Sequence, residues 1–226
     1  MNEISDWHPR PRPERVTLEG RFCRLEAVEP ARHGDALFAA SMAPGAEERF
    51  RYLGDSPQDR ASFEDWLHKA AASSDPLFYA VIDCATGRCE GRQALMRITP
   101  EHGVIEIGNI LWGPAIARTR VATEALFLHA TYVFESLGYR RFEWKCNALN
   151  VPSRRAAERF GFQYEGIFRQ HMVVKGQSRD TAWFAMVDGE WPTLRSAFDR
   201  WLAPENFDSA GRQKAKLEDL RGRIGS

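Results

Sequence analysis

One segment, residues 106–125 (EIGNILWGPAIARTRVATEA), limits the fold of this chain more than any other. Residues 104–111 are mostly apolar with several β-branched side chains, which is typical of a buried strand. Gly113 and Pro114 end this strand, and apolar residues then recur at three- and four-residue spacing. This spacing predicts one wide apolar face of a long helix, which Gly138 ends in a left-handed conformation. The segment therefore predicts a strand that enters a helix through a short loop.

A helix that begins after such a loop offers an anion-binding site at residues 117–123. The first N–H groups of a helix have no partner within it, and the helix dipole favours negative charge there. Arg118 and Arg120 add positive charge at the same place. We therefore interpret residues 117–123 as the site of a phosphate-bearing ligand. The alternative is an ordinary strand-to-helix connection with two solvated arginines.

The charge of the chain is balanced, because its 226 residues include 31 Lys and Arg and 31 Asp and Glu. This balance gives no reason to expect a nucleic acid or an anionic membrane as partner, and it disfavours a strongly charged substrate. No apolar run approaches the length of a membrane span, and the N-terminal residues lack an apolar signal core. We expect the protein to be cytoplasmic.

Four cysteines are present: Cys23, Cys84, Cys89 and Cys146. None forms a Cys-x-x-Cys pair, and none lies at metal-ligand spacing from another cysteine or a histidine. We expect reduced, structural thiols and no metal. Cys146 as a nucleophile is the alternative, although no histidine lies close to it in the sequence.

The remaining patterns predict three parts: an extended, proline-rich arm at residues 1–15, a domain at 16–202, and a polar, loose or weakly helical tail at 203–226. Strands are predicted at 21–29, 77–84, 93–99, 104–111, 141–146, 162–174 and 179–187, and helices at 31–42, 60–72, 120–137, 153–160 and 192–202. Two of the helices cross over between strands. The chain is therefore predicted to be an α/β protein with a mixed sheet and helices on both faces.

A second motif follows the strand at 141–146. It reads Asn-x-x-Asn-x-x-Ser-x-x-x-Ala-x-x-x-Gly-Phe and is formed by Asn147, Asn150, Ser153, Ala157, Gly161 and Phe162. With the phosphate loop and the tetrapeptide at residues 122–125 before it, the chain resembles the GNAT N-acetyltransferase superfamily, in its RimJ/RimL-like branch. The resemblance covers about residues 15 to 190. It implies a mostly antiparallel sheet with splayed central strands, acetyl-CoA as co-substrate and a primary amine as acceptor.

The resemblance also implies where acetyl-CoA binds. Its pantetheine arm would lie between the strand at 104–111 and the strand at 141–146, bonded to the backbone of Ile110, Leu111 and Trp112. Its diphosphate would meet the loop and first helical turn, and three further residues would face the thioester end. The loop residues are Ala117, Arg118, Thr119, Arg120, Val121, Ala122 and Thr123, and the other three are Asn147, Asn150 and Ser153.

The loop departs from the family pattern at two positions. Ala117 stands where the family has Gln or Arg, and Arg120 stands where it has glycine. Glycine allows the backbone to approach a phosphate closely, whereas arginine can pair with phosphates through two hydrogen bonds. We expect coenzyme binding to be kept, with some loss of affinity.

Acetyl transfer to an amine needs a base, an oxyanion donor and an acid for the leaving thiolate. We predict Glu106 as the base, directly or through a water, because strand alternation places it on one face with Gly108 and Ile110 among poorly solvating isoleucines. Ser153 is predicted as the acid and the N–H of Leu111 as the oxyanion donor. The alternatives are an ion pair between Glu106 and an arginine such as Arg97, and a purely structural Ser153.

Three residues are predicted to line the acceptor site. Asn109 and His171 are polar residues among apolar strand neighbours, and Tyr52 lies in an irregular segment that would cover this side. A structural role is the alternative for His171. A protein N-terminus, a small amine and an amino-acid-like antibiotic all stay open as acceptors, and homodimer formation through the last strands stays undecided.

Two functions of other classes are kept as alternatives. Arg120 in place of glycine favours a non-catalytic domain that binds or senses acyl-CoA. A structural domain without a ligand is the other, and saturable binding of coenzyme A would exclude it.

Overall fold

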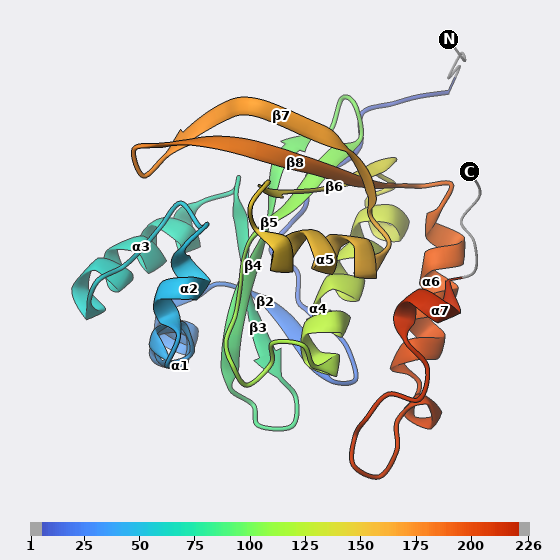
Figure 1. The fold of residues 1–226 in the computed structure, drawn as a ribbon, viewed down its shortest axis with the longest axis horizontal. Coiled ribbons are helices and arrows are strands. Elements are labelled where there is room, and N and C mark those ends of the chain that lie inside the picture. The colour runs from blue at the N-terminus through green and yellow to red at the C-terminus, as the bar shows by residue number, and fades with distance from the viewer. Residues whose placement is uncertain (1–5, 222–226) are drawn as a thin grey trace.

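A single eight-stranded sheet forms the centre of the computed structural model, which describes residues 6–221 (Figure 1). Its strand order is β1-β2-β3-β4-β5-β6-β8-β7. Neighbouring strands are antiparallel except β5 and β6, which are parallel. The strands are β1 Leu18–Glu19, β2 Cys23–Ala27, β3 Leu77–Asp83, β4 Cys89–Thr99, β5 Val104–Trp112, β6 Arg141–Asn147, β7 Gln163–Val174 and β8 Gln177–Val187. The predicted mixed, mostly antiparallel sheet is confirmed.

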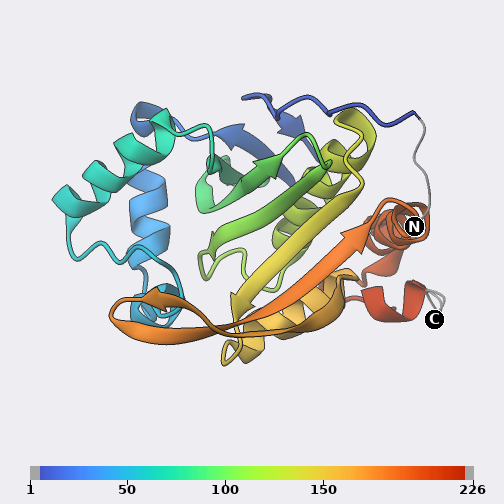
Figure 2. The same ribbon diagram turned by 90° about the horizontal axis from the view of Figure 1, so that it is seen from above.

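Helices cover both faces of this sheet, as predicted (Figure 2). One face carries α1 Pro30–Met42, the short α2 Ala46–Phe50 and α3 Arg60–Ala72. The other carries α4 Arg120–Thr131, its π-helical continuation η1 Tyr132–Ser136, α5 Val151–Phe160 and α6 Trp191–Leu202. Two clusters of buried apolar side chains result, one beneath α1 and α3 and a larger one beneath α4, α5 and α6. Among residues 6–221, no helix has the length and apolar composition needed to cross a membrane.

Local signals set the ends of the helices that frame the central strands. The side chain of Thr119 accepts a hydrogen bond from the N–H of Val121 and so caps α4. Asn150 caps α5 by accepting from the N–H of Ser153, and Gly161 ends α5 with a positive φ of 99°. These residues hold both helices in fixed register against the strands that precede them.

The central pair, β5 and β6, stays together over only part of its length. The two strands are paired from Val104 and Arg141 to Ile107 and Trp144. Beyond that point β5 continues to Trp112 and β6 to Asn147 without pairing to each other. The backbone groups that face this gap are therefore not used by the sheet, as the predicted splay requires.

Residues 203–221 belong to the tail that the sequence predicts as loose or weakly helical. They form η2 Pro204–Asn206 and α7 Leu217–Leu220, and the side chain of Leu217 is completely buried. The Asn206 amide donates to the carbonyl oxygens of Trp201 and Ala215, and the Phe207 ring packs on Trp201. Single apolar residues anchor the segment without any helical periodicity, so the sequence pattern did not reveal them. Residues 222–226 lie outside the described part.

Residues 6–15 of the N-terminal arm run extended along the turn between β4 and β5 (Figure 2). The indole N–H of Trp7 donates to the carbonyl of Glu101 at 2.8 Å, and the Arg10 N–H donates to that of Pro100. Further along, the carbonyl of Glu14 accepts from the Tyr79 hydroxyl. The arm is thus held by hydrogen bonds to the sheet, while residues 1–5 are outside the described range.

Candidate active site

Glu106 lies on β5 just before the point where β5 and β6 part, with only 3% of the residue exposed. Its Oε2 atom is 2.7 Å from Nη1 of Arg97 and 3.0 Å from Nζ of Lys145. Lys145 also contacts the Glu143 carboxylate at 2.5 Å. The ion pair with Arg97 is the alternative that the sequence left open, whereas Lys145 was missed. Arg97 and Lys145 thus hold the Glu106 carboxylate in a fixed position.

A β-bulge at Asn109 changes the side-chain alternation after Glu106. Asn109 has a φ of 51°, and the register between β4 and β5 shifts at this place. Gly108 stays beside the Glu106 carboxylate, but Ile110 packs against the core cluster on the opposite face. The prediction that Ile110 shares a face with Glu106 is therefore wrong, because a bulge adds one residue to the strand. The Asn109 amide itself contacts the sulfur of Met96 at 3.6 Å.

The head of α4 presents unpaired donors, as expected of an anion site. Of the seven predicted loop residues, four use their N–H groups within the protein, bonded to Gly113, Ile116 or Thr119; these are Ala117, Thr119, Val121 and Thr123. The other three N–H groups have no hydrogen-bond partner among residues 6–221; they belong to Arg118, Arg120 and Ala122. Arg118 has a left-handed φ of 64°. Three free N–H groups at a helix start suit a phosphate group.

Two arginine side chains flank this helix head. The guanidinium carbon of Arg120 lies 4.6 Å from the ring centre of Phe22 and 4.8 Å from that of Phe207. Arg159 of α5, which sequence reasoning missed, donates from Nη1 to Oγ1 of Thr123 at 3.2 Å. Burial lowers the pKa of Arg159, against the opposing effect of an acidic neighbour. An anion at the head of α4 would stabilise the charge of this half-buried guanidinium.

The loop between β6 and α5 uses its predicted side chains for local structure. Asn147 Oδ1 accepts from the N–H of Leu149 at 2.9 Å, which forms a turn. Asn150 caps α5, and Ser153 Oγ accepts a hydrogen bond of 3.0 Å from the Trp144 indole. The Ser153 hydroxyl also lies within hydrogen-bonding reach of the Cys146 thiol. The predicted roles of these residues toward a coenzyme stay predictions.

Cys146, beside this loop, is 5% exposed. Burial raises the pKa of its thiol, so the thiolate that a nucleophile requires is disfavoured. The four cysteines are free thiols, and only Cys84 is exposed. Within residues 6–221, no group of His, Cys, Asp or Glu side chains is arranged to hold a metal ion.

On the side where the acceptor is predicted to bind, the structure brings Tyr52 and Asn147 together. Both line a cavity of about 520 Å³, and the Tyr52 hydroxyl donates to the carbonyl of Leu149 at 3.4 Å. His171 lies apart from them on β7, with Nδ1 3.0 Å from Oγ1 of Thr181. Desolvation, followed by the charges of nearby Arg and Lys side chains, lowers the pKa of His171. His171 therefore favours its neutral form at neutral pH.

An aromatic wall stands next to the Glu106 ion pairs. The ring centres of Phe168 and Trp183 lie 4.4 Å apart, and His171 packs against both rings. Nζ of Lys145 lies 3.9 Å from the ring centre of Trp183. The wall, Lys145 and Glu106 thus form one continuous surface.

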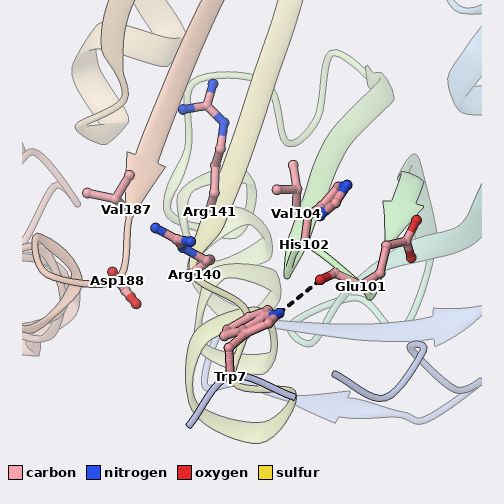
Figure 3. A pocket seen from close by; sticks show the side chains of 8 residues that line it. All are labelled: Trp7, Glu101, His102, Val104, Arg140, Arg141, Val187 and Asp188. Carbon is pink, nitrogen blue, oxygen red and sulfur yellow. Dashed lines mark hydrogen bonds between the residues drawn. The ribbon is translucent and has the colours of Figure 1, made fainter. Parts of the chain in front are cut away.

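A larger cavity, of about 730 Å³, lies at the other end of the central strands (Figure 3). Val104 and Arg141, which line it, form the pair at which the pairing of β5 with β6 begins. Trp7 of the N-terminal arm and Asp188 face the same hollow. This cavity lies away from the strand gap, so it is not the site of the predicted chemistry.

A family model described as an acetyltransferase (GNAT) domain matches residues 24–163, which is more than half of the chain. The chain belongs to the GNAT acetyltransferase family. The resemblance stated from the sequence is thereby confirmed. The parting of β5 from β6 and the unpaired N–H groups at the start of α4 agree with the fold that this resemblance implies.

Solved structures and a curated relative agree with this assignment. A GCN5-related N-acetyltransferase from Brucella melitensis is 62% identical, with 96% of this chain and 99% of that chain covered and a TM-score of 0.95. A probable GNAT-family acetyltransferase from Chromobacterium violaceum is 38% identical, with 85% and 96% covered and a TM-score of 0.78. The uncharacterized N-acetyltransferase p20 of Bacillus licheniformis is 30% identical over 117 residues, which is 50% of this chain; the match spans 63% of that protein. These relatives support the prediction of an N-acetyltransferase.

Proposed function

We propose that this chain transfers the acetyl group of acetyl-CoA to a primary amine by direct attack in a ternary complex. The observation that carries the proposal is the parting of β5 and β6 after Ile107 and Trp144, directly beyond the buried carboxylate of Glu106. A gap between two strands can receive an extended pantetheine arm, because the backbone groups on its edges are unpaired. When bound there, acetyl-CoA would supply an acyl group activated as a thioester.

The residues present fit the coenzyme. The free N–H groups of Arg118, Arg120 and Ala122 would receive the diphosphate, and the guanidinium of Arg159 adds a positive charge beside Thr123. The backbone of Ile110, Leu111 and Trp112 lies on the part of β5 that has lost its pairing with β6. It would bind the amides of the arm, and the N–H of Leu111 would support the developing oxyanion.

Glu106 is proposed to take the proton that the ammonium form of the acceptor must lose before it can attack. Arg97 and Lys145 bind its carboxylate and fix its orientation, so that it can accept a proton directly or through a water. The nitrogen of the amine then forms a bond with the thioester carbon as the carbon–sulfur bond breaks.

Ser153 is proposed to donate a proton to the leaving thiolate. Its oxygen accepts from the Trp144 indole, which fixes the position of the hydroxyl. As the amide forms, the attacking nitrogen loses the proton that it still carries. This proton returns to the protein and so balances the one that Ser153 donates. Asn150 positions Ser153 by capping the helix on which it lies.

A second candidate is a domain that binds acyl-CoA without turnover. The guanidinium of Arg120 is packed between the Phe22 and Phe207 rings, and Arg120 occupies the position where the family has glycine. Coenzyme binding without thiol release, across a broad panel of amines, would favour this candidate.

The Glu106→Gln variant tests the proposal. The amide cannot accept the proton, so kcat should fall about 100- to 10,000-fold while calorimetric affinity for acetyl-CoA stays within about threefold. Glu143→Gln is the matched control, because Glu143 is also buried and binds the same Lys145 amine. Its kcat should fall less than about tenfold. Equal activity of the Glu106→Gln variant and the unaltered protein would remove Glu106 from the mechanism.

A further inference from the structure

The cavity on the acceptor side is framed by three segments that are far apart in the sequence. They are the residues after α2, the loop between β6 and α5, and the turn of the β7–β8 hairpin. The hairpin turn lies beside α2 (Figure 2), and Nζ of Lys175 donates to the carbonyl of Phe50 at 2.8 Å. The Tyr52 hydroxyl reaches the carbonyl of Leu149 across the same rim, and the cavity has a volume of about 520 Å³.

The charges along this cavity are not balanced. Three of its side chains are cationic, namely Arg51, Lys175 and Arg179, and one is acidic, Asp180. Arg51 contacts Glu48 on the surface. Lys175 Nζ is bonded only to neutral oxygens, and neither Lys175 nor Arg179 forms an ion pair within residues 6–221. The cavity therefore holds two positive charges without carboxylate partners.

Arg179 is the cation that reaches furthest toward the chemistry. It lies on β8 at alternate positions with Thr181 and Trp183, so all three side chains lie on the face that carries Lys145. Its Nε atom is buried and has no hydrogen-bond partner in the part of the chain that the structure describes. A buried guanidinium nitrogen without an acceptor is unfavourable, and an anionic ligand would satisfy it.

The charges around Arg179 also favour an anionic ligand at this position. Burial lowers the pKa of Arg179, and the nearby positive charge of Arg97 lowers it further, whereas the Glu106 carboxylate acts in the opposite direction. The geometry agrees: Trp183, on the same face of β8 as Arg179, lies 3.9 Å from Nζ of Lys145, and that amine is 3.0 Å from the Glu106 carboxylate. A ligand that spans the two groups would place an anionic end on Arg179 and a cationic end near Glu106.

We propose that the acceptor carries a carboxylate next to its primary amine, so that its chemical class is amino acids and small molecules built on them. Arg179 receives the carboxylate, Lys175 contributes positive charge at the rim, and Glu106 faces the amine. This inference rests on the proposed function. A zwitterion has no net charge, in keeping with a protein of balanced charge, whereas the amine of an ordinary protein N-terminus has no carboxylate beside it and would leave both cations unmatched.

The test compares free amino acids with their C-terminal amides as acceptors, with acetyl-CoA as donor and released thiol as the readout. We expect kcat/KM to be about 100-fold higher for the free acid. Arg179→Gln should raise the KM for the acid about 10- to 100-fold, with kcat and amide turnover nearly unchanged, and Arg179→Lys should recover part of the loss. Arg169→Gln is the control, because Arg169 is an exposed arginine on the same hairpin, and it should have no effect.

The outcomes separate this inference from the function beneath it. Equal rates with acids and amides, or a strong preference for peptides, would overturn the amino-acid class while leaving acetyl transfer intact. Absence of thiol release with every amine would instead overturn the proposed function. In that case calorimetric titration of the coenzyme A complex with the same amino acids decides the inference: binding that Arg179→Gln abolishes supports it, and lack of binding refutes it.

Discussion

The buried histidine beneath the end of β5 leads to a prediction about how stability depends on pH. His129 of α4 is completely buried, and its Nδ1 atom lies 2.8 Å from Nε2 of Gln93. The Gln93 amide also donates to the carbonyl of Ala125 and accepts from the indole of Trp112, so it must donate to His129. His129 is therefore an acceptor at Nδ1 and neutral. Burial lowers its pKa from 6.5 to about 3.

The size of the effect follows from linkage. Between about pH 6.5 and pH 3 the unfolded chain binds a proton at His129 and the folded protein does not. The contribution of the neutral His129 ring to the free energy of unfolding is therefore fully present above pH 6.5 and is lost as the pH falls toward 3. Each pH unit in this window corresponds to about 1.4 kcal/mol, so lowering the pH from 7.5 to 5.0 removes about 2 kcal/mol through this residue alone.

Urea unfolding of the unaltered protein and of His129→Asn, at both pH values, measures this contribution. Asparagine does not titrate and keeps a short acceptor toward Gln93. The variant will be less stable at pH 7.5, since a buried ring is lost, but the difference between the two proteins should shrink by about 2 kcal/mol at pH 5.0. A difference that stays constant to within about 0.5 kcal/mol would refute a buried neutral histidine.

Two further predictions concern packing. Gly161→Ala should lower the free energy of unfolding by about 1–3 kcal/mol in urea titrations, because φ at this position is 99° and the new Cβ meets Leu194. Gly189→Ala is the control and should change the free energy of unfolding little, because the space around Gly189 is open. Equal effects of the two substitutions would contradict the role of Gly161 as the end of α5. Leu217→Ala should cost about 2–4 kcal/mol by the same assay, against less than about 0.5 for Leu149→Ala at a 76% exposed side chain. A small loss at Leu217 would mean that α7 does not pack as described.

The sequence predicted the elements whose signals are local. Gly138 as a left-handed helix end, with a φ of 67°, and the apolar face of residues 120–137 both depend on neighbours within a few residues. Elements that depend on distant packing were missed. The short helix α2 and the helix around Leu217 have no repeat long enough to show periodicity, and tertiary contacts alone hold them in place.

Contacts of the candidate site could be predicted where they depend on residues close together in the sequence. They could not be predicted where they depend on how separate strands pair. The ion pair of Glu106 with Arg97 was foreseen as an alternative, but Lys145 becomes a partner only through the parallel register, which sets Glu106 opposite Glu143. Gly108 inside the strand is a signal of the bulge at Asn109, and strict alternation, which ignored this signal, misplaced Ile110. Arg179 lies in a hairpin whose bulged register cannot be read from spacing.

The sheet separates the two halves of the proposed reaction. The helix head that would hold the donor lies with α4 and α5 on one face, while the β7–β8 hairpin turn and Tyr52 enclose the cavity on the other. Changes in the hairpin can therefore alter which amine is accepted without touching the residues that grip the donor. Descendants of one ancestral protein could in this way diversify their acceptors by varying two strands, while the chemistry between them stays the same.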